Sequence, residues 1–238
     1  MLTTNGDNRL MVGRLALLCL GASLLAGCSV LPERAAERRT SSSTATPVRS
    51  AAIPRSPATG QCLAELGRTG AEYAPVPDRY VEQGCAILGT VRLASLPSDT
   101  SSFGVTNLGP VTCEVSQAFT GWARYGVDRA ARQILGSPVR SIETFGSYSC
   151  RNVAGSGRRS AHATGAAIDI SGFVLEDGRR IMVESAWHGG TASERQFLRT
   201  VQQSACKRFD TVLGPEYNSA HHDHLHLEGI IGTKSYCR

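Results

Sequence analysis

Lysine is scarce in this sequence, and the basic residues are not clustered. Only Lys207 and Lys234 are lysines among the 25 basic residues, and the arginines are scattered along the chain. Proteins that bind nucleic acid gather basic side chains on one face or along one helix. The sequence therefore predicts no nucleic-acid partner, and its net charge of +5 is typical of a solvated surface.

The apolar run Leu15–Leu25 is too short to span a membrane. It follows Arg9 and Arg14, an order typical of a signal peptide. The run ends in Leu-Ala-Gly-Cys28, which resembles a bacterial lipobox and predicts a lipoprotein signal peptide over residues 1–27 with lipid on Cys28. A plain signal peptide with an incidental cysteine is the alternative.

Ser29 follows Cys28 and, by resemblance to enterobacterial sorting, favours the outer membrane. We expect an exported, periplasmic protein anchored to a membrane by lipid.

Residues 28–59 lack apolar periodicity and are rich in Ser, Thr, Ala, Pro and Arg. Such a composition buries too little apolar surface to offset the entropy of ordering the chain. We therefore predict a disordered tether over residues 28–59. Residues 60–238 contain no visible internal repeat and suffice for one globular domain, which we expect to be a monomer.

The cysteines lack the C-x-x-C spacing of a structural zinc site. An even number of them lies in the predicted domain: Cys62, Cys85, Cys113, Cys150, Cys206 and Cys237. In an exported protein this pattern predicts disulfides. Six cysteines allow fifteen pairings, and the sequence does not choose among them.

The apolar patterns predict short helices and strands. Helices are expected over residues 62–66, 113–135 and 194–207, and strands over residues 91–96, 139–145, 166–170, 211–213 and 224–228. Ser193 would cap the last helix, and Gly121 and Gly126 would allow a break in the second. Residues 173–175 and 181–183 flank Asp177-Gly178, which favours a hairpin turn. We predict the α+β class, with a small antiparallel sheet flanked by helices that pack on it.

Four of the six histidines lie in one short run, Ser219–Glu228. Imidazole is the commonest metal ligand in proteins and the side chain best suited to move protons near pH 7. His224 and His226 are two residues apart in a predicted strand, so their side chains point to the same face. One of them can bind a metal ion while the other reaches a water molecule or substrate atom beside it.

A second group of candidate ligands precedes this run. Asp169 lies between Ile168 and Ile170 in a predicted strand, so its carboxylate faces away from the core that the isoleucines enter. His162 lies seven residues earlier, and Gly165 and small alanines between them permit a tight backbone fold. Two histidines and one carboxylate with an open position are the ligand pattern of catalytic zinc.

Two motifs resemble known zinc peptidases. Ser160-x-His162-x-x-Gly165-x-Ala167-x-Asp169, followed by His224-x-His226, resembles a group that includes D-Ala-D-Ala carboxypeptidases, lysostaphin-type enzymes and penicillin-insensitive murein endopeptidase. The wider run His221-x-x-His224-x-His226 is similar to the endopeptidase version. Residues 146–151, residues 212–218 and the cysteines resemble more closely the bacterial extensin-like C-terminal domain family. That resemblance implies a fold like that of the D-Ala-D-Ala carboxypeptidase or hedgehog-type zinc peptidases.

The resemblance also implies roles for single residues. It implies that Zn²⁺ is bound by His162, Asp169 and His226, that His224 handles a proton, and that Arg151 polarises the carbonyl of the scissile bond. It makes His221 an auxiliary histidine of the site. His222 competes for that place, because strict alternation would put His222 on the face of His224.

Asp223 and Ser160 lie beside the candidate histidines in the sequence. Many relatives carry Glu three residues before the last zinc histidine, where this chain has the shorter Asp223. Either His224 is the base, with Asp223 orienting a histidine, or Asp223 is the base. Ser160 is expected to shape its loop rather than act as a nucleophile, because no Gly-x-Ser-x-Gly elbow surrounds it.

These expectations lead to three classes of function. The first is a lipid-anchored zinc metallopeptidase that hydrolyses peptide bonds in peptidoglycan stem peptides or cross-links. The second is a non-catalytic lipoprotein that binds peptidoglycan and keeps zinc as structure. The third is a zinc peptidase for another exported peptide. The sequence leaves open whether a D,D or L,D bond is cut, and whether the bond is terminal or within a cross-link.

Overall fold

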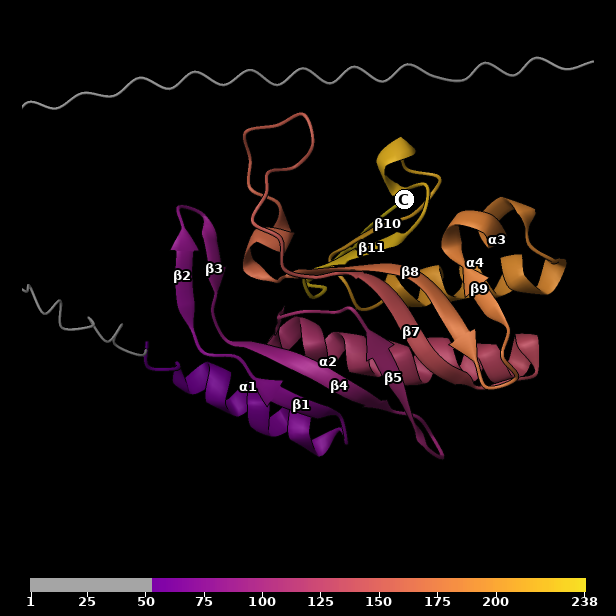
Figure 1. Ribbon diagram of the computed structural model, residues 1–238, viewed down its shortest axis with the longest axis horizontal. Coiled ribbons are helices and arrows are strands. Elements are labelled where there is room, and N and C mark those ends of the chain that lie inside the picture. The colour runs from indigo at the N-terminus through magenta and orange to yellow at the C-terminus, as the bar shows by residue number, and fades with distance from the viewer. Residues whose placement is uncertain (1–52) are drawn as a thin grey trace, which may run out of the picture. The chain divides into compact units, whose positions relative to one another are not determined.

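The computed structural model describes residues 53–238 (Figure 1). Within them the α-helices are α1 (Pro57–Arg68), α2 (Cys113–Trp122), α3 (Val183–Gly189) and α4 (Ala192–Ala205). None of these helices has the length and apolar character needed to cross a membrane. The predicted signal peptide, Cys28 and residues 28–52 of the predicted tether lie outside the described residues. Helix α1, capped by the Ser56 side chain, begins three residues before the predicted start of the domain.

Ten strands form one mixed sheet (Figure 1). They are β1 (Glu72–Pro75), β4 (Thr90–Pro97), β5 (Ser102–Thr106), β6 (Val111–Thr112), β7 (Val139–Gly146), β8 (Ala167–Leu175), β9 (Arg180–Met182), β10 (Thr211–Leu213), β11 (Leu225–Glu228) and β12 (Tyr236–Cys237). The order is β1-β4-β5-β7-β8-β11-β10-β12, with β6 beside β4 and β9 beside β8. Strands β2 (Arg79–Glu82) and β3 (Cys85–Ile87) form a separate hairpin.

The α+β class and a mostly antiparallel sheet are confirmed, but the predicted small size of the sheet is wrong. All pairings in the large sheet are antiparallel except β5 with β7 and β10 with β12. The unpredicted strands β1, β5, β6 and β12 have two to five residues each. So few residues show no clear alternation of polar and apolar side chains, and tertiary pairing defines these strands.

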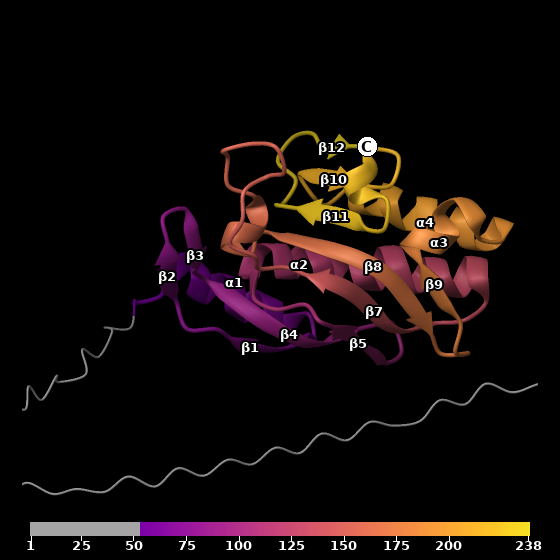
Figure 2. The ribbon, with the colours of Figure 1, turned by 45° about the horizontal axis from the view of Figure 1, so that its top comes forward.

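Helices α2 and α4 lie on the same side of the sheet in both ribbon views (Figures 1 and 2). Their aromatic side chains meet the sheet in the core: the rings of Trp122 and Phe173 are 6.2 Å apart, and those of Phe173 and Phe197 are 5.1 Å apart. All three are fully buried. The helices thus cover one face of β8, and the other face remains available for polar side chains.

The helical segment 113–135 is continuous, so the possible break at its glycines does not occur. Residues 123–128 and 131–135 have π-helical hydrogen bonding, and Gly136 ends the segment in the left-handed conformation. A Cβ atom at Gly126 would overlap the Ser204 hydroxyl of α4. Gly126 is therefore needed for the close approach of the two helices and does not end the first.

Two predicted boundaries are corrected by the backbone. Thr191, rather than Ser193, caps α4, in a capping box with Glu194. The predicted strands 166–170 and 173–175 are one strand, β8, with an irregular register between them. The bulge inserts one residue, so Ile168 and Ile170 before it and Phe173 after it all enter the same core.

The structure selects one of the fifteen disulfide pairings. Cys62–Cys113 joins α1 to α2, Cys85–Cys150 joins β3 to the loop before Arg151, and Cys206–Cys237 joins the end of α4 to β12. The loops they close span 51, 65 and 31 residues. In the chain-entropy description, each stabilises the fold by about 3–4 kcal/mol.

Candidate metal centre

Strand register places the central groups of the site in one row across the sheet. Asp169 of β8 pairs with Gly146 of β7 on one side and with His226 of β11 on the other, and His226 also pairs with Leu213 of β10. Neighbouring side chains in such a row lie on the same face. The carboxylate of Asp169 and the imidazole of His226 therefore meet on the face opposite the helices.

His162 reaches the row from a short 3₁₀ turn, Ala161–Thr164. The Ser160 side chain accepts a hydrogen bond from the His162 amide and caps the turn. Gly165 ends it with a positive φ of 67°, and a Cβ atom there would lie 2.9 Å from the Pro110 carbonyl oxygen. Ser160 and Gly165 thus fix the backbone on both sides of His162 and bring its ring to Asp169.

The three predicted ligands converge. His162 Nε2 lies 3.2 Å from Asp169 Oδ2, and His226 Nδ1 lies 2.9 Å from Asp169 Oδ1. The two ring nitrogens are 3.2 Å apart. His162 and His226 are buried, with 2% and 7% of their surfaces exposed. Two imidazole nitrogens and a carboxylate oxygen therefore lie close enough together to bind one metal ion.

The donor set fits Zn²⁺, because the second nitrogen of each imidazole already has a partner. His162 Nδ1 donates to the Ser147 carbonyl, and His226 Nε2 donates to Glu228 Oε2 at 3.0 Å. Zinc-binding histidines usually donate their other ring N–H in this way, which fixes the tautomer and the orientation of the ring. His162 Nε2, His226 Nδ1 and one oxygen of Asp169 would hold the ion, with a fourth position open.

Without a cation, these groups hold a proton instead. Burial lowers the pKa of His226, but hydrogen bonds to Asp169 and Glu228 outweigh it and raise the pKa to about 9. Burial likewise opposes ionisation of Asp169, but hydrogen bonds from His162 and His226 outweigh it and hold its pKa well below the usual value. At pH 7 a positively charged His226 therefore lies between the carboxylates of Asp169 and Glu228. A divalent cation can take the place of the proton that faces Asp169.

His224 lies beside the ligands with its ring held in place. Its Nδ1 donates to Asp223 Oδ1 at 2.7 Å, and its Nε2 lies 3.5 Å from Asp169 Oδ1. The ring of Phe145 packs edge-on against it, with the centroids 5.9 Å apart. Because Asp223 accepts the Nδ1 proton, the Nε2 lone pair faces the centre and is available to accept a proton.

The structure separates the two candidate auxiliary histidines. The ring of His221 lies 5.1 Å from that of His224 and 5.8 Å from that of His226, and its Nδ1 donates to Asn218 Oδ1. Burial lowers the pKa of His221 to about 4, so its ring is neutral at pH 7. The side chain of His222 is 63% exposed and bonds the Ser219 carbonyl. Strand β11 begins only at Leu225, so strict alternation does not apply this far back.

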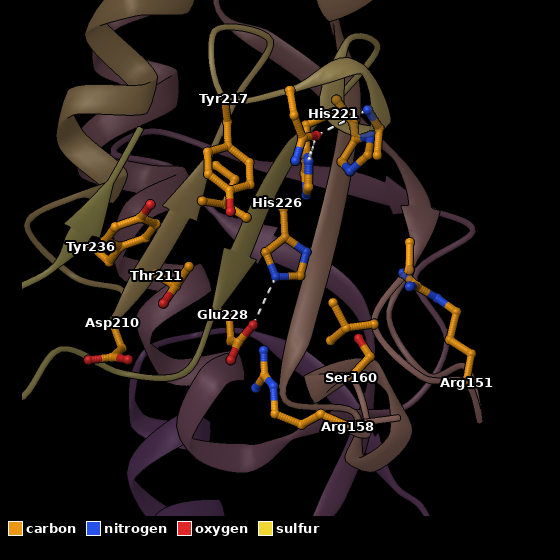
Figure 3. A pocket seen from close by; sticks show the side chains of 16 residues that line it. Arg151, Arg158, Ser160, Asp210, Thr211, Tyr217, His221, His226, Glu228 and Tyr236 are labelled. Atoms are coloured by element: carbon orange, nitrogen blue, oxygen red, sulfur yellow. Dashed lines mark hydrogen bonds and ion pairs between the residues drawn. The ribbon is translucent and has the colours of Figure 1, made fainter. Parts of the chain in front are cut away.

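Arg151 lies on the other side of the centre. Its guanidinium is 4.0 Å from Asp169 Oδ2 and is half exposed. Together with Ser160, His221, His224 and His226 it lines a cleft of about 590 Å³. Figure 3 shows Arg151 and Ser160 on one side of this cleft, Tyr217 and Tyr236 on the opposite side, and His226 between them.

Several residues of the centre had no predicted role. Glu228 holds the ring of His226, the Ser147 carbonyl holds that of His162, and Asn218 holds that of His221. Glu228 is two residues after His226 in the same strand. The alternation that put His224 and His226 on one face therefore also predicts that the Glu228 side chain points to that face. The contacts of Ser147 and Asn218 depend on loop geometry and have no comparable signal in the sequence.

A second cluster of potential ligands, Glu82 with Cys85 and Cys150, lies in the described part of the chain. Its two cysteines form a disulfide, so neither offers a thiolate. Of the two clusters, only the histidine–carboxylate cluster has donor chemistry suited to zinc.

The fold and this cluster define an α+β protein with a candidate zinc centre on the open face of its sheet. The family described as "Extensin-like protein C-terminus" matches residues 60–238, and the chain belongs to that family. The match covers all the residues of the centre. No curated protein and no solved structure matches the chain.

Proposed function

We propose that this protein is an exported, lipid-anchored zinc metallopeptidase that hydrolyses peptide bonds in peptidoglycan stem peptides or cross-links. The observation that carries the proposal is the pairing of His162 and His226: each imidazole has one nitrogen bonded to the protein and the other aimed at Asp169. The likeness of the His162–Asp169 and His224–His226 motifs to D-Ala-D-Ala carboxypeptidases and murein endopeptidases supports the substrate class.

The first chemical requirement is a nucleophile strong enough to attack a peptide carbonyl. Bound Zn²⁺ supplies this chemistry, because it lowers the pKa of a coordinated water toward neutrality and polarises a carbonyl oxygen. His162, Asp169 and His226 would hold the ion. Glu228 and the Ser147 carbonyl keep the two imidazoles in the orientation that presents the correct nitrogen.

The second requirement is a group that moves a proton. The His224–Asp223 pair meets it, because Asp223 holds the Nδ1 proton and leaves Nε2 facing the centre. His224 Nε2 takes the proton of the attacking water and returns it to the amine that leaves. General acid–base catalysis of this kind contributes about 10²–10⁴-fold to a rate.

The third requirement is stabilisation of negative charge on the carbonyl oxygen. The Arg151 guanidinium is half exposed beside Asp169, so it faces both the centre and the cleft. A preorganised positive group at the position where negative charge develops is among the most effective contributions to catalysis. His221, neutral and held by Asn218, lies beside His224 as a hydrogen-bonding group for the substrate.

The proposed place of action follows from the start of the sequence. Lipid on Cys28 and a tether over residues 28–59 would keep the domain beside a membrane and within reach of the wall. Two experiments would test the membrane anchor separately from the chemistry. One is protease cleavage of the domain from the membrane surface, and the other is metabolic labelling of Cys28 with a fatty acid.

The test of the activity is digestion of purified sacculi by the zinc-loaded full chain, with muropeptides identified by mass. We expect loss of cross-linked dimers or of terminal D-Ala, which a chelator abolishes and which His224→Ala reduces by about 10²–10⁴-fold. His224→Ala should still bind one zinc ion, since His224 is not among the ligands. Unchanged muropeptides with zinc bound and the fold intact would contradict the proposal, and sacculus binding without hydrolysis would favour a wall-binding protein.

A further inference from the structure

The candidate metal centre lies between two hollows. The first is the cleft of about 590 Å³ described above, over β11, β10 and β12. The second, of about 430 Å³, lies over the ends of β4, β5 and β7 and is lined by Arg92, Asn107, Phe145, Gly146 and Tyr148 among others. Apart from the Ser147 carbonyl that holds His162, nothing in the catalytic scheme above uses the lining of this second hollow.

Strand register shows that the two hollows lie on opposite sides of the metal ligands. The row across the sheet runs from Gly146 through Asp169 and His226 to Leu213. Gly146 lines the second hollow, and Leu213 lines the first. Phe145 stands between them, because it lines the second hollow while its ring packs on His224, which lines the first.

The second hollow has the polar groups of a binding site. Asn107 adopts a positive φ of 58°, which is costly for a residue other than glycine, and its side chain holds the Thr144 carbonyl. The hydroxyls of Ser147 and Tyr148 are buried without a hydrogen-bond partner among the described residues. Ser147 also accepts the bond from His162, so this hollow shares a backbone segment with the metal centre.

Arginines line both hollows. In residues 53–238, neither Arg92 in the second hollow nor Arg158 in the first forms an ion pair, and Arg151 has only its contact with Asp169. The first cleft also contains Asp210 at its side and Glu228, which is engaged by His226. A peptide with carboxylates on both sides of the scissile bond complements this arrangement.

We propose that the substrate crosses the centre, with one acidic peptide arm in each hollow, so that the enzyme is an endopeptidase that cuts cross-links. This inference rests on the proposed function and adds which bond is cut. The reaction breaks the C–N bond of the cross-link, adds the hydroxyl of water to the acyl carbon and leaves the proton on the amine. A carboxypeptidase needs only one deep subsite, because its substrate ends one residue beyond the cut.

The test compares two substrates of the zinc-loaded full chain: a purified cross-linked muropeptide dimer that lacks terminal D-Ala, and a monomer with a pentapeptide stem. We expect kcat/KM for the dimer to exceed that for the monomer by at least about tenfold. Removal of D-Ala from the monomer at an equal or higher rate would overturn the inference and leave the proposed function intact. Cleavage of neither substrate with zinc bound would overturn both.

A matched pair of charge reversals tests the second hollow. Arg92→Glu should lower kcat/KM for the dimer by about tenfold, mainly through KM, because a rim charge that attracts a carboxylate becomes one that repels it. Arg140→Glu reverses another exposed arginine that lines neither hollow and should leave kcat/KM within about twofold. Equal values for the two variants, with equal zinc content, would exclude the second hollow as the site of an arm.

Discussion

The two faces of strands β8 and β11 carry opposite chemistry on the same backbone. On one face, Ile168 and Leu227 are fully buried against the helices. On the other, Asp169 and His226 are held by hydrogen bonds beside a cleft. The apolar face is tied by packing to the largest side chains of the molecule, whereas the polar face is tied by a few directed bonds.

The two faces together make the candidate centre rigid. The helices hold the strands in register from one side, and the register alone brings Asp169 opposite His226. The polar face then requires only a few further contacts, from Glu228, Asp223, Ser147 and the turn that carries His162. Substitutions on the apolar face should therefore lower mainly the free energy of unfolding, and substitutions on the polar face should lower mainly the zinc affinity.

The largest effect is expected for Asp169→Asn on the polar face. The change removes the charged ligand that both histidines face, and it should lower the zinc affinity by more than about 100-fold, since partners outside the ligand set already contribute 10–100-fold. Competition with a chelator of known affinity measures it. A zinc affinity within about tenfold of the parent protein would show that Asp169 is not a ligand.

On the apolar face, Leu227→Ala should lower the free energy of unfolding by about 2–5 kcal/mol, because it leaves a cavity under the helices. Chemical denaturation measures this in the zinc-loaded protein. Ile230→Ala is the matched control, because that side chain is 52% exposed and should change stability by less than about 0.5 kcal/mol. Similar losses in the two variants would mean that the face of Leu227 is not the packed one.

Glu228→Gln tests the bond that orients His226. An amide in place of the carboxylate weakens the hydrogen bond from Nε2, so zinc affinity should fall by about 10–100-fold with the fold retained. Glu176→Gln, at an exposed position in the β8–β9 turn, is the control. If both variants bind zinc as the parent does, Glu228 has no part in holding the ligand.

The raised pKa of His226 predicts proton release. With a pKa of about 9 in the metal-free protein, His226 is protonated at pH 7, and zinc binding should release about one proton from it. Calorimetry in two buffers of different ionisation enthalpy counts the protons. Release of none at pH 7 would contradict the raised pKa.

The same shift affects the stability of the metal-free protein. A pKa raised from 6.5 to about 9 means that the folded state binds the proton more tightly, so the contribution of this pair is complete below pH 6.5 and is lost as pH rises through about 9. The melting temperature of the metal-free protein should therefore fall over this window. That of the zinc-loaded protein should fall less, because the metal then occupies the place of the proton.

The smallest effects distinguish the neighbouring histidines. His221→Ala removes the proposed hydrogen-bonding group for the substrate and should lower kcat/KM by about tenfold, the value of about one hydrogen bond. His222→Ala changes an exposed side chain and should have less than a twofold effect. A larger loss in His222→Ala would reverse the assignment of these two residues.

Much of the fold and of the centre was predictable where a local period or a turn signal was present. Strand β7, the hairpin between β8 and β9, and strand β10 were predicted from alternation and from Asp-Gly. The ends of helix α4 and the short strands β1, β5, β6 and β12 were not, because their boundaries depend on caps and on pairing partners far away in the sequence. Localisation, the lipid on Cys28, the monomeric state and the absence of a nucleic-acid partner stay predictions.

Local patterns predict which side chains face the same way: the alternation of Ile168, Asp169 and Ile170 and the spacing of His224 and His226 are properties of a strand with a period of two. The motifs also determined the family. Long-range packing selects the disulfide pairing, places His221 rather than His222 at the centre, and forms the second hollow beyond Phe145. These depend on contacts between segments far apart in the chain, whose approach is set by packing of the whole core and leaves no local pattern.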